Sequence, residues 1–404
     1  MNLRSLHAPR SSARLLLAQL AFAAALLAGC GGGGGPDASG TGTSGTSSFA
    51  AGPITGFGSI IVNGVRFDDS TARVTNDDGS ASSKDNIKLG MTAEVHGGGV
   101  RDDGSGPRAT ARDIIVGAAL VGPVASIDAT AKSFVVLGQT VLVLDTTVFG
   151  ERVPGGFAGL TVGMLVEVHG QLDALTGLYT ATRVGATLGL AGYKIRGIVA
   201  NLDTTAKTFT MGGTLISYAG VTSVPAGLAN GMLLAVGLQT VQVGGTWIAT
   251  RLGAGARRVD DADQARIRGA ITAFTSITQF SVNGIPVDAS HAEFEGGTAG
   301  VVLGAQVDVR GTSSNGVIIA QRVQVRTHEE QHVEGFVLHG AVTAIDTTAR
   351  TFVLREVTVS YGSPNVEFIR ITAAQLVLGV QLEVRGTLSA DGTQLQATRI
   401  ALDD

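Results

Sequence analysis

An internal repeat is the feature of this sequence that most constrains its fold. Five copies each open with a glycine, and successive copies are offset by 70, 75, 72 and 71 residues. The opening residues are Gly52, Gly122, Gly197, Gly269 and Gly340. Self-similarity at this period predicts a row of similar small units rather than one large domain. With 58 glycines and 44% hydrophobic residues, the chain has the composition of a folded protein with many tight turns.

Two hairpin turns recur inside the copies. The first is a run such as Asp128-Ala129-Thr130-Ala131, whose small polar residues between alternating apolar ones predict a turn. The second is a two-residue turn, for which Asn-Gly is well suited because it tolerates positive φ angles. It lies at Asn63-Gly64, Leu137-Gly138, Gly212-Gly213 and Asn283-Gly284. We expect the repeated phenylalanines at strand starts to fill the core: Phe134, Phe209, Phe280 and Phe352.

The later part of each copy predicts two more strands. One is a block such as Gly163 to Gly170, in which Val166 and Val168 share the core face while Glu167 and His169 share the opposite, solvent face. The other carries an Ala-Thr-Arg-Val type of motif, as at Ala181 to Val184. Three meandering strands, an irregular or briefly helical crossover and two further strands are the order of a five-stranded Greek-key barrel that resembles an OB-fold. An SH3-like arrangement is the alternative.

The fold class predicted is therefore all-β: a tandem array of five small five-stranded OB-like barrels in a row, after a disordered N-terminal tether. The predicted boundaries are a signal peptide at 1–29, a Gly/Ser/Thr-rich tether at 30–50, and repeats at 51–118, 119–190, 191–256, 257–328 and 329–404.

The N-terminus has the pattern of an export signal. Three arginines precede an apolar run, Leu15 to Leu27, that is shorter than the about 20 residues of a membrane span. The run ends in Leu27-Ala28-Gly29-Cys30, which resembles a bacterial lipoprotein signal with Cys30 as the lipidated residue. A cleaved secretion signal with an incidental cysteine is the alternative. Cys30 is the only cysteine, so no disulfide can form within the chain.

The residues after Cys30 favour a surface-tethered protein. A Gly/Ser-type chain of this length has a mean reach of about 25 Å. Gly31 follows the cysteine, and resemblance to lipoproteins of two-membrane bacteria implies sorting to the outer membrane, on its periplasmic or surface side. The expected partner is therefore the membrane, through the lipid on Cys30.

A family resemblance adds architecture and location. The run Gly56 to Asp68, together with the Gly-Met-x-Val-Glu-Val-x-Gly block, resembles the bacterial domain-of-unknown-function family 5666, whose members are exported, often lipid-anchored tandem-repeat proteins. The resemblance extends over nearly all of residues 51–402. The third copy departs from it, because Gly231 to Gly237 lacks the acidic and basic positions. The family name implies no activity.

Four side chains share one position of the repeated block: His96, His169, Arg310 and Arg385. We expect them to point outward, where they pair with neighbouring acids or recognise an acidic group on a partner. They are the predicted surface recognition residues.

One segment matches a catalytic motif. His328-Glu329-Glu330-Gln331-His332 matches H-E-x-x-H, in which a helix places two histidines on one face to bind zinc. Strand patterns on both sides leave no room for a helix, so we expect a solvated linker and no metal site. A metal-dependent hydrolase that uses His328 and His332 is the alternative.

The charge balance argues against nucleic acid as a partner. The formal net charge is −4, and loss of the three leader arginines makes it −7, whereas nucleic-acid binders usually carry a basic surface. We expect a non-catalytic protein without a cofactor, whose repeats form a rod that serves as a structural or binding scaffold for an envelope protein or a glycan. A glycan-binding module is a further alternative.

Overall fold

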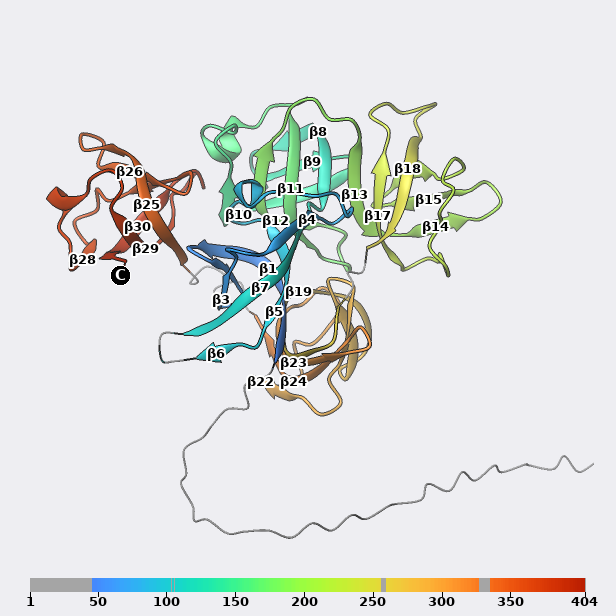
Figure 1. Ribbon diagram of the computed structural model, residues 1–404. Helices are drawn as coiled ribbons and strands as arrows, with labels where there is room; N and C mark the ends of the chain where they lie inside the picture. Colours follow the sequence, from blue (N-terminus) through green and yellow to red (C-terminus); the bar gives the residue numbers. More distant parts are fainter. Residues whose placement is uncertain (1–45, 103, 105, 256–258, 327–334, 404) are drawn as a thin grey trace, which may run out of the picture. The chain divides into compact units, whose positions relative to one another are not determined.

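The computed structural model describes residues 46–403 except 103, 105, 256–258 and 327–334, and this part of the chain consists mainly of β-strands (Figure 1). Within it, the only helical elements are three short 3-10 turns: η1 (Lys84–Asn86), η2 (Gly156–Gly159) and η3 (Ala373–Gln375). No helix in these ranges has the length and apolarity needed to span a membrane. The predicted all-β class is confirmed. The predicted signal peptide and Cys30 lie outside the described residues.

The strands fall into five consecutive segments. Segment 1 contains β1 (Ser47–Phe57), β2 (Ile60–Val62), β3 (Val65–Asp68), β4 (Arg73–Asn76), β5 (Thr92–Gly98), β6 (Arg101–Asp102) and β7 (Pro107–Val116). Segment 2 contains β8 (Leu120–Asp128), β9 (Ser133–Val136), β10 (Gln139–Phe149), β11 (Leu165–Leu172) and β12 (Tyr179–Ala186). Segment 3 contains β13 (Tyr193–Ile198), β14 (Ala200–Asp203), β15 (Thr208–Met211), β16 (Thr214–Ser217), β17 (Leu233–Leu238) and β18 (Trp247–Ala254).

The remaining strands form the last two segments. Segment 4 contains β19 (Ala262–Ser276), β20 (Gln279–Val282), β21 (Ile285–Asp288), β22 (Glu293–Glu295), β23 (Gln306–Ser314) and β24 (Val317–Val325). Segment 5 contains β25 (Phe336–Asp346), β26 (Thr351–Leu354), β27 (Val357–Ser360), β28 (Glu367–Ile369), β29 (Gln381–Leu388) and β30 (Leu395–Leu402).

Segment 2 is a closed barrel of five strands. The antiparallel meander β8-β9-β10 is followed by a parallel pairing of β10 with β12. β12 pairs with β11, and β11 pairs with β8, which closes the ring. Segment 5 closes in the same order through β25, β26, β27, β30 and β29. Closure gives the backbone groups at both edges of these short sheets a partner.

The other segments contain related pairings. Segment 1 pairs β1-β2-β3-β7-β5-β1, and segment 4 pairs β19-β20-β21-β24-β23-β19. In segment 3 the first strand is divided into β13 and β14, of which β13 pairs with β17 and β14 with β15. The extra strands β4, β22 and β28 each run parallel to the last strand of their segment.

Both predicted hairpin turns are confirmed. At the two-residue turns both φ angles are positive, as the tight hairpin turn requires: Asn63-Gly64 (51° and 73°), Leu137-Gly138 (49° and 75°), Gly212-Gly213 (51° and 84°) and Asn283-Gly284 (50° and 83°). Segment 5 has the same turn at Arg355-Glu356 (48° and 63°), which residue type did not predict. At the other turn, the Oδ1 atom of Asp128 accepts hydrogen bonds from the backbone N–H groups of Thr130 and Ala131.

The repeat-opening glycine lies directly under the two-residue turn. A Cβ atom on Gly269 would lie 1.9 Å from Nδ2 of Asn283, and a Cβ atom on Gly52 would lie 2.4 Å from Oδ1 of Asn63. In segment 2 the neighbour is Leu137, whose Cγ would lie 2.9 Å from a Cβ on Gly122. In these three segments the turn side chain fills the space that a Cβ would need, which favours glycine at the opening position.

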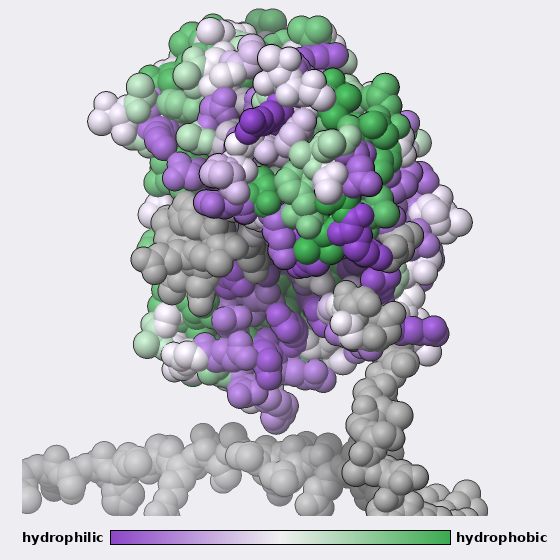
Figure 2. All heavy atoms as spheres, turned by 90° about the vertical axis from the view of Figure 1, so that its left-hand side faces the viewer, coloured by the Kyte–Doolittle hydropathy of each residue, from purple (hydrophilic) through white to green (hydrophobic). Residues whose placement is uncertain are grey.

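The repeated phenylalanines fill the core, as predicted: Phe134, Phe209, Phe280 and Phe352 are all buried. Buried apolar residues of segments 1 and 5 form one cluster together with Val148 of segment 2, and those of segments 2 and 3 form another. Buried apolar residues of segment 4 form a third cluster with Phe49 and Ala51 of segment 1. Figure 2 shows one face of the molecule, on which hydrophilic residues gather in the lower part of the view. The most exposed large apolar side chains of the described chain lie outside the strands: Val162, Leu175, Leu188, Val241, Val243 and Leu378.

Two expectations about the arrangement are wrong. β1 begins at Ser47, inside the segment 30–50 that was expected to be a tether. Residues 48–51 of β1 also pair in parallel with residues 264–267 of β19, and Gly56 and Phe57 pair with Val337 and Leu338 of β25. Segment 1 thus contacts segments 4 and 5, which differs from a row in which each repeat contacts only its chain neighbours.

β1 pairs with β19 because the barrel of segment 1 leaves one edge of β1 without a partner. One edge of β1 pairs with β5 from Ser47 onward, but β2 joins the other edge only from Ile54. The unpaired backbone groups before Ile54 need a partner, and β19 supplies it. The same occurs in segment 2, where Leu120 and Val121 of β8 pair with β13 before β9 joins at Val124.

Candidate functional site

His169 is buried and held at both ring nitrogens. Its exposed fraction is 2%. The backbone N–H of Thr92 donates to Nδ1 at 3.2 Å, so in the neutral ring the proton resides on Nε2, which lies 2.9 Å from Oε1 of Glu167. Burial opposes the ionisation of Glu167, but the hydrogen bond from His169 and nearby positive charges outweigh it and lower the pKa of Glu167. Neither ring nitrogen is left to accept a proton from a substrate.

His96 is also buried, at 5% exposure, so the prediction that His96 and His169 point to solvent is wrong. The ring of His96 packs 5.0 Å from the ring of Phe49, and its Nδ1 lies 3.6 Å from Oδ2 of Asp260. Burial lowers the pKa of His96 despite the nearby Asp260 carboxylate, which raises it. Contacts with other segments cover the strand faces that the alternating pattern assigned to solvent, as the contact from Thr92 to His169 shows.

Arg310 and Arg385 are exposed, with side-chain exposures of 47% and 54%. Each pairs with the acid two residues earlier on its own strand: Nε of Arg385 lies 2.8 Å from Oε1 of Glu383, and Nε of Arg310 lies 3.5 Å from Oδ1 of Asp308. The four predicted recognition residues belong to four different described segments, and none of them forms a hydrogen bond or an ion pair with another of the four. They do not form one site.

A third buried histidine, His339, was not predicted to be a site residue. Nη1 of Arg66 lies 3.3 Å from its Nε2, and Oδ2 of Asp403 lies 3.0 Å from its Nδ1. Because a guanidinium only donates, the proton of the neutral ring resides on Nδ1 and points to Asp403. Burial lowers the pKa of His339, while the hydrogen bond to Asp403 raises it. This histidine links segment 5 to segment 1.

The remaining predicted residues lie outside the described residues: Cys30, His328 and His332. In the ranges that the structure covers, no group of three or more His, Cys, Asp or Glu side chains is placed to hold a metal ion. In the acidic turn at Asp77-Asp78-Gly79, Oδ1 of Asp78 accepts hydrogen bonds from the N–H and hydroxyl of Ser80, whereas the carboxylate of Asp77 pairs with Lys194.

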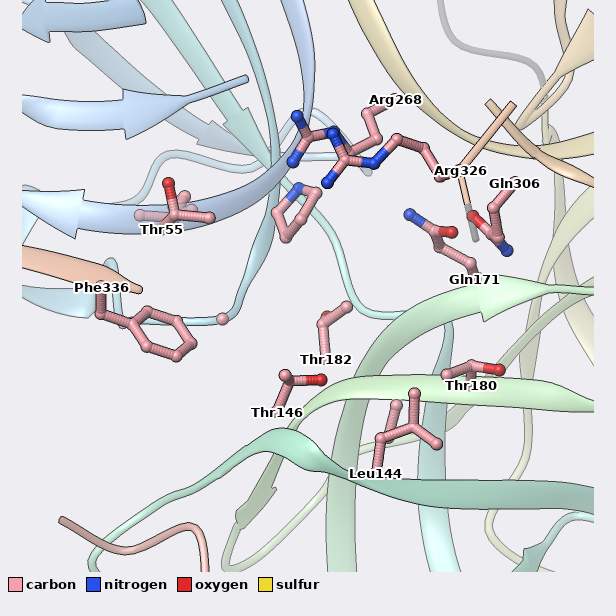
Figure 3. A pocket seen from close by; sticks show the side chains of 14 residues that line it. Thr55, Leu144, Thr146, Gln171, Thr180, Thr182, Arg268, Gln306, Arg326 and Phe336 are labelled. Atoms are coloured by element: carbon pink, nitrogen blue, oxygen red, sulfur yellow. The ribbon is translucent and has the colours of Figure 1, made fainter. Parts of the chain in front are cut away.

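A small cavity lies where segments 1, 2, 4 and 5 meet (Figure 3). Arg268 and Arg326 reach toward it from segment 4, while Thr146, Thr180 and Thr182 line it from segment 2. Its volume is about 110 Å³, whereas small-molecule sites usually measure about 300–1,000 Å³. A cavity of this size holds a few water molecules, so we interpret it as a polar junction between segments and not as a ligand site.

Two larger open pockets adjoin at Arg183. One measures about 750 Å³ and the other about 660 Å³, and both are lined by Lys88, Arg152 and Arg183. Nη1 of Arg183 donates to the backbone oxygen of Leu89 at 3.0 Å. Burial lowers the pKa of Arg183 to about 10, and the nearest acidic groups raise it, so the group remains a cation at neutral pH. These pockets have the size of a small-molecule site.

Sequence reasoning noted Arg183 only as part of a strand motif. Comparing, between copies, the residues that pair with the last strand would have identified Arg183. Such a comparison requires the strand register, which the sequence alone does not give. Burial of His96, His169 and His339 depends on contacts between segments, and no local pattern encodes these.

Comparison with known proteins supports the repeat. The family model described as "Domain of unknown function (DUF5666)" matches residues 121–185, 268–324 and 339–401. These ranges fall on segments 2, 4 and 5, which is narrower than the expected extent of 51–402. No curated protein matches the sequence. In three of its repeated segments, the chain thus matches the model of the DUF5666 family.

Proposed function

We propose that this protein is a non-catalytic, lipid-anchored component of the bacterial cell envelope whose five segments are OB-like barrels that act as a binding scaffold. The partner is an envelope protein or a glycan, and no cofactor or nucleic acid takes part. The barrel assignment is supported by the ring order, in which the third and last strands of a segment run parallel, as β10 and β12 do.

One observation carries the non-catalytic proposal. A general base needs a nitrogen that can reach a substrate proton, but His169 and His339 each have both ring nitrogens occupied by protein groups. Each of these histidines has a partner in segment 1, Thr92 for His169 of segment 2 and Arg66 for His339 of segment 5. These histidines therefore suit the joining of segments.

The anchor and location are proposed from the sequence. The apolar run that ends in Leu27-Ala28-Gly29-Cys30 supports lipid attachment at Cys30, and Gly31 supports outer-membrane sorting. A Gly-rich tether would hold the barrels close to the membrane surface.

Metabolic labelling tests the anchor. Cells that express the full chain are grown with labelled palmitate, alongside cells that express Cys30→Ala. We expect label on the wild-type protein and none on the variant. Equal labelling of both proteins, or of neither at equal expression, would refute the lipid anchor.

Cross-linking in intact cells tests the scaffold role. We expect the wild-type protein to trap a specific envelope protein or glycan, and the trapped species is identified after purification. The counter-result is a purified protein that turns over a hydrolase substrate and loses this activity when one side chain is changed.

A further inference from the structure

The last strand of a segment carries a charged residue at one fixed register position. It lies opposite the shared His or Arg position of the preceding strand: Asp113 pairs with His96, Arg183 with His169, and Arg322 with Arg310. These three residues are therefore structural equivalents, and their surroundings can be compared directly.

In segments 1 and 4 this charge is neutralised from the parallel strand beside it. In segment 4, Nη1 of Arg322 lies 3.0 Å from Oε1 of Glu295, and Nη2 lies 3.6 Å from Oε2 of Glu293. In segment 1 the signs are reversed, and Nη2 of Arg73 lies 2.8 Å from Oδ1 of Asp113. The position is built for an ion pair of either polarity.

In segment 2 the partner carboxylates are missing. Val148 pairs with Arg183 and so takes the place that Glu293 has opposite Arg322 in segment 4. Two residues later, Gly150 takes the place of Glu295. Among the described residues Arg183 has no ion pair, and its one hydrogen bond goes to the carbonyl of Leu89. A Cβ atom on Gly150 would lie 3.0 Å from Nη2 of Arg183, so the glycine leaves open the space beside the guanidinium.

The carboxylates around this space are mostly engaged elsewhere. In the two pockets that adjoin at Arg183, Glu167 bonds to His169, Asp77 pairs with Lys194, and Glu356 pairs with Lys88. Further acids in the pockets are Asp78 and Asp391, which bond within their own turns, and Glu151. Arg152, which has no ion pair in the part that the structure covers, lines both pockets with Arg183.

We propose that the Arg183 position of segment 2 binds an external oxyanion, the carboxylate or phosphate of a small polar molecule, in place of the carboxylates that neutralise Arg322. The planar guanidinium presents paired donors that match such a group. Because acids and bases are nearly balanced around the pockets, the site suits a ligand with one anionic group rather than a polyanion. This inference rests on the proposed binding function and is independent of the lipid anchor.

Calorimetric titration of the purified full-length protein at low salt tests the site. The soluble probes are inorganic phosphate and glucuronate, with glucose as the neutral comparison. Sedimentation with phosphatidylglycerol or phosphatidylcholine vesicles distinguishes a lipid headgroup from a free oxyanion. We expect phosphate and glucuronate to bind and glucose not to bind.

Three variants localise the binding. Arg183→Gln should weaken it about tenfold or more, since a charge-assisted hydrogen bond is lost. Arg322→Gln removes the equivalent but already neutralised arginine and should leave the affinity unchanged. Gly150→Glu restores the carboxylate of segment 4 and should abolish binding without removing the arginine, whereas Gly150→Gln adds the same bulk without the charge and should retain more affinity.

The outcomes are distinct. Binding of a soluble oxyanion that Gly150→Glu abolishes supports the site, and it does so even if Arg183→Gln fails to fold. Binding only to phosphatidylglycerol vesicles, with the same dependence on Gly150→Glu, supports the site with a lipid headgroup as ligand. Absence of binding to all probes, or equal loss in Gly150→Gln and Gly150→Glu, overturns the proposal, and the palmitate and cross-linking results remain unaffected.

Discussion

A methyl group on the repeat-opening glycine of segment 4 should destabilise that segment, because the turn side chain already fills the space. A Cβ on residue 269 would lie 1.9 Å from Nδ2 and 2.5 Å from Cγ of Asn283. Nδ2 also donates to the backbone oxygen of Arg268 at 3.2 Å. Gly269→Ala must therefore displace the amide, and the displacement breaks this hydrogen bond.

The expected cost follows from these two effects. Forcing a methyl group into filled space usually costs about 1–3 kcal/mol, and a lost intramolecular hydrogen bond costs about 0.5–1.5 kcal/mol. We expect the free energy of unfolding of segment 4 to fall by about 2–4 kcal/mol. Asn283→Gly alone should cost about 1 kcal/mol, since it removes the hydrogen bond but suits the positive φ of 50° at this turn.

Hydrogen exchange followed by mass spectrometry measures the effect in residues 262–325 separately from the rest of the chain. The double variant Gly269→Ala/Asn283→Gly should be more stable than Gly269→Ala alone, because the second change removes the side chain that the methyl group meets. If Gly269→Ala changes protection by less than about 0.5 kcal/mol, or if the second change restores nothing, the packing explanation for the repeated glycine is incorrect.

Two further predictions concern the core and the pH. Phe209→Ala should lower the stability of segment 3 by about 3–5 kcal/mol, because Phe209 is fully buried. The fluorescence of Trp247, the only tryptophan in the sequence, reports the unfolding of this segment. Leu215→Ala is the control, and its effect should be much smaller because the Leu215 side chain is half exposed. His96 and His339 have pKa values lowered by burial, so the unfolded chain binds more protons than the folded one, and stability should be lost as pH falls below about 6.5. The midpoint of urea unfolding measured from pH 7.5 to pH 5 checks this, and a constant midpoint would contradict it.

The hairpins were predictable because their signals are local. Asn-Gly and Gly-Gly favour positive φ at two successive residues, and a carboxylate such as Asp128 can bond to the backbone two and three residues on. The alternation of Val166 and Val168 with polar residues also identified the core face correctly, as both valines are buried. The turn at Arg355-Glu356 escaped prediction because the surrounding strands impose it on residues that do not favour it.

The outer faces were not predictable, since alternation tells which residues share a face but not what covers that face. Glu94 and His96 have the pattern of a solvent face, yet both are buried. The pairing of β1 with β19 joins residues more than 200 positions apart, and no short-range pattern specifies such contacts. The surroundings of Arg183 were not predictable for the same reason, because they depend on Val148 of β10 and on Gly150, which follows that strand.

The charged position of the last strand varies between segments for an energetic reason. The ion pairs there are partly exposed, with side-chain exposures of 77% for Arg73 and 45% for Arg322, and exposed pairs contribute about 0–1 kcal/mol. Reversing the charges, as Arg73 and Asp113 do, or removing the carboxylates, as at Val148 and Gly150, therefore costs the barrel little. The buried phenylalanines have no such freedom, because each contributes several times as much. The sequences of the copies should therefore differ most at positions such as Arg183. A change of charge there alters what the surface can bind and leaves the barrel intact.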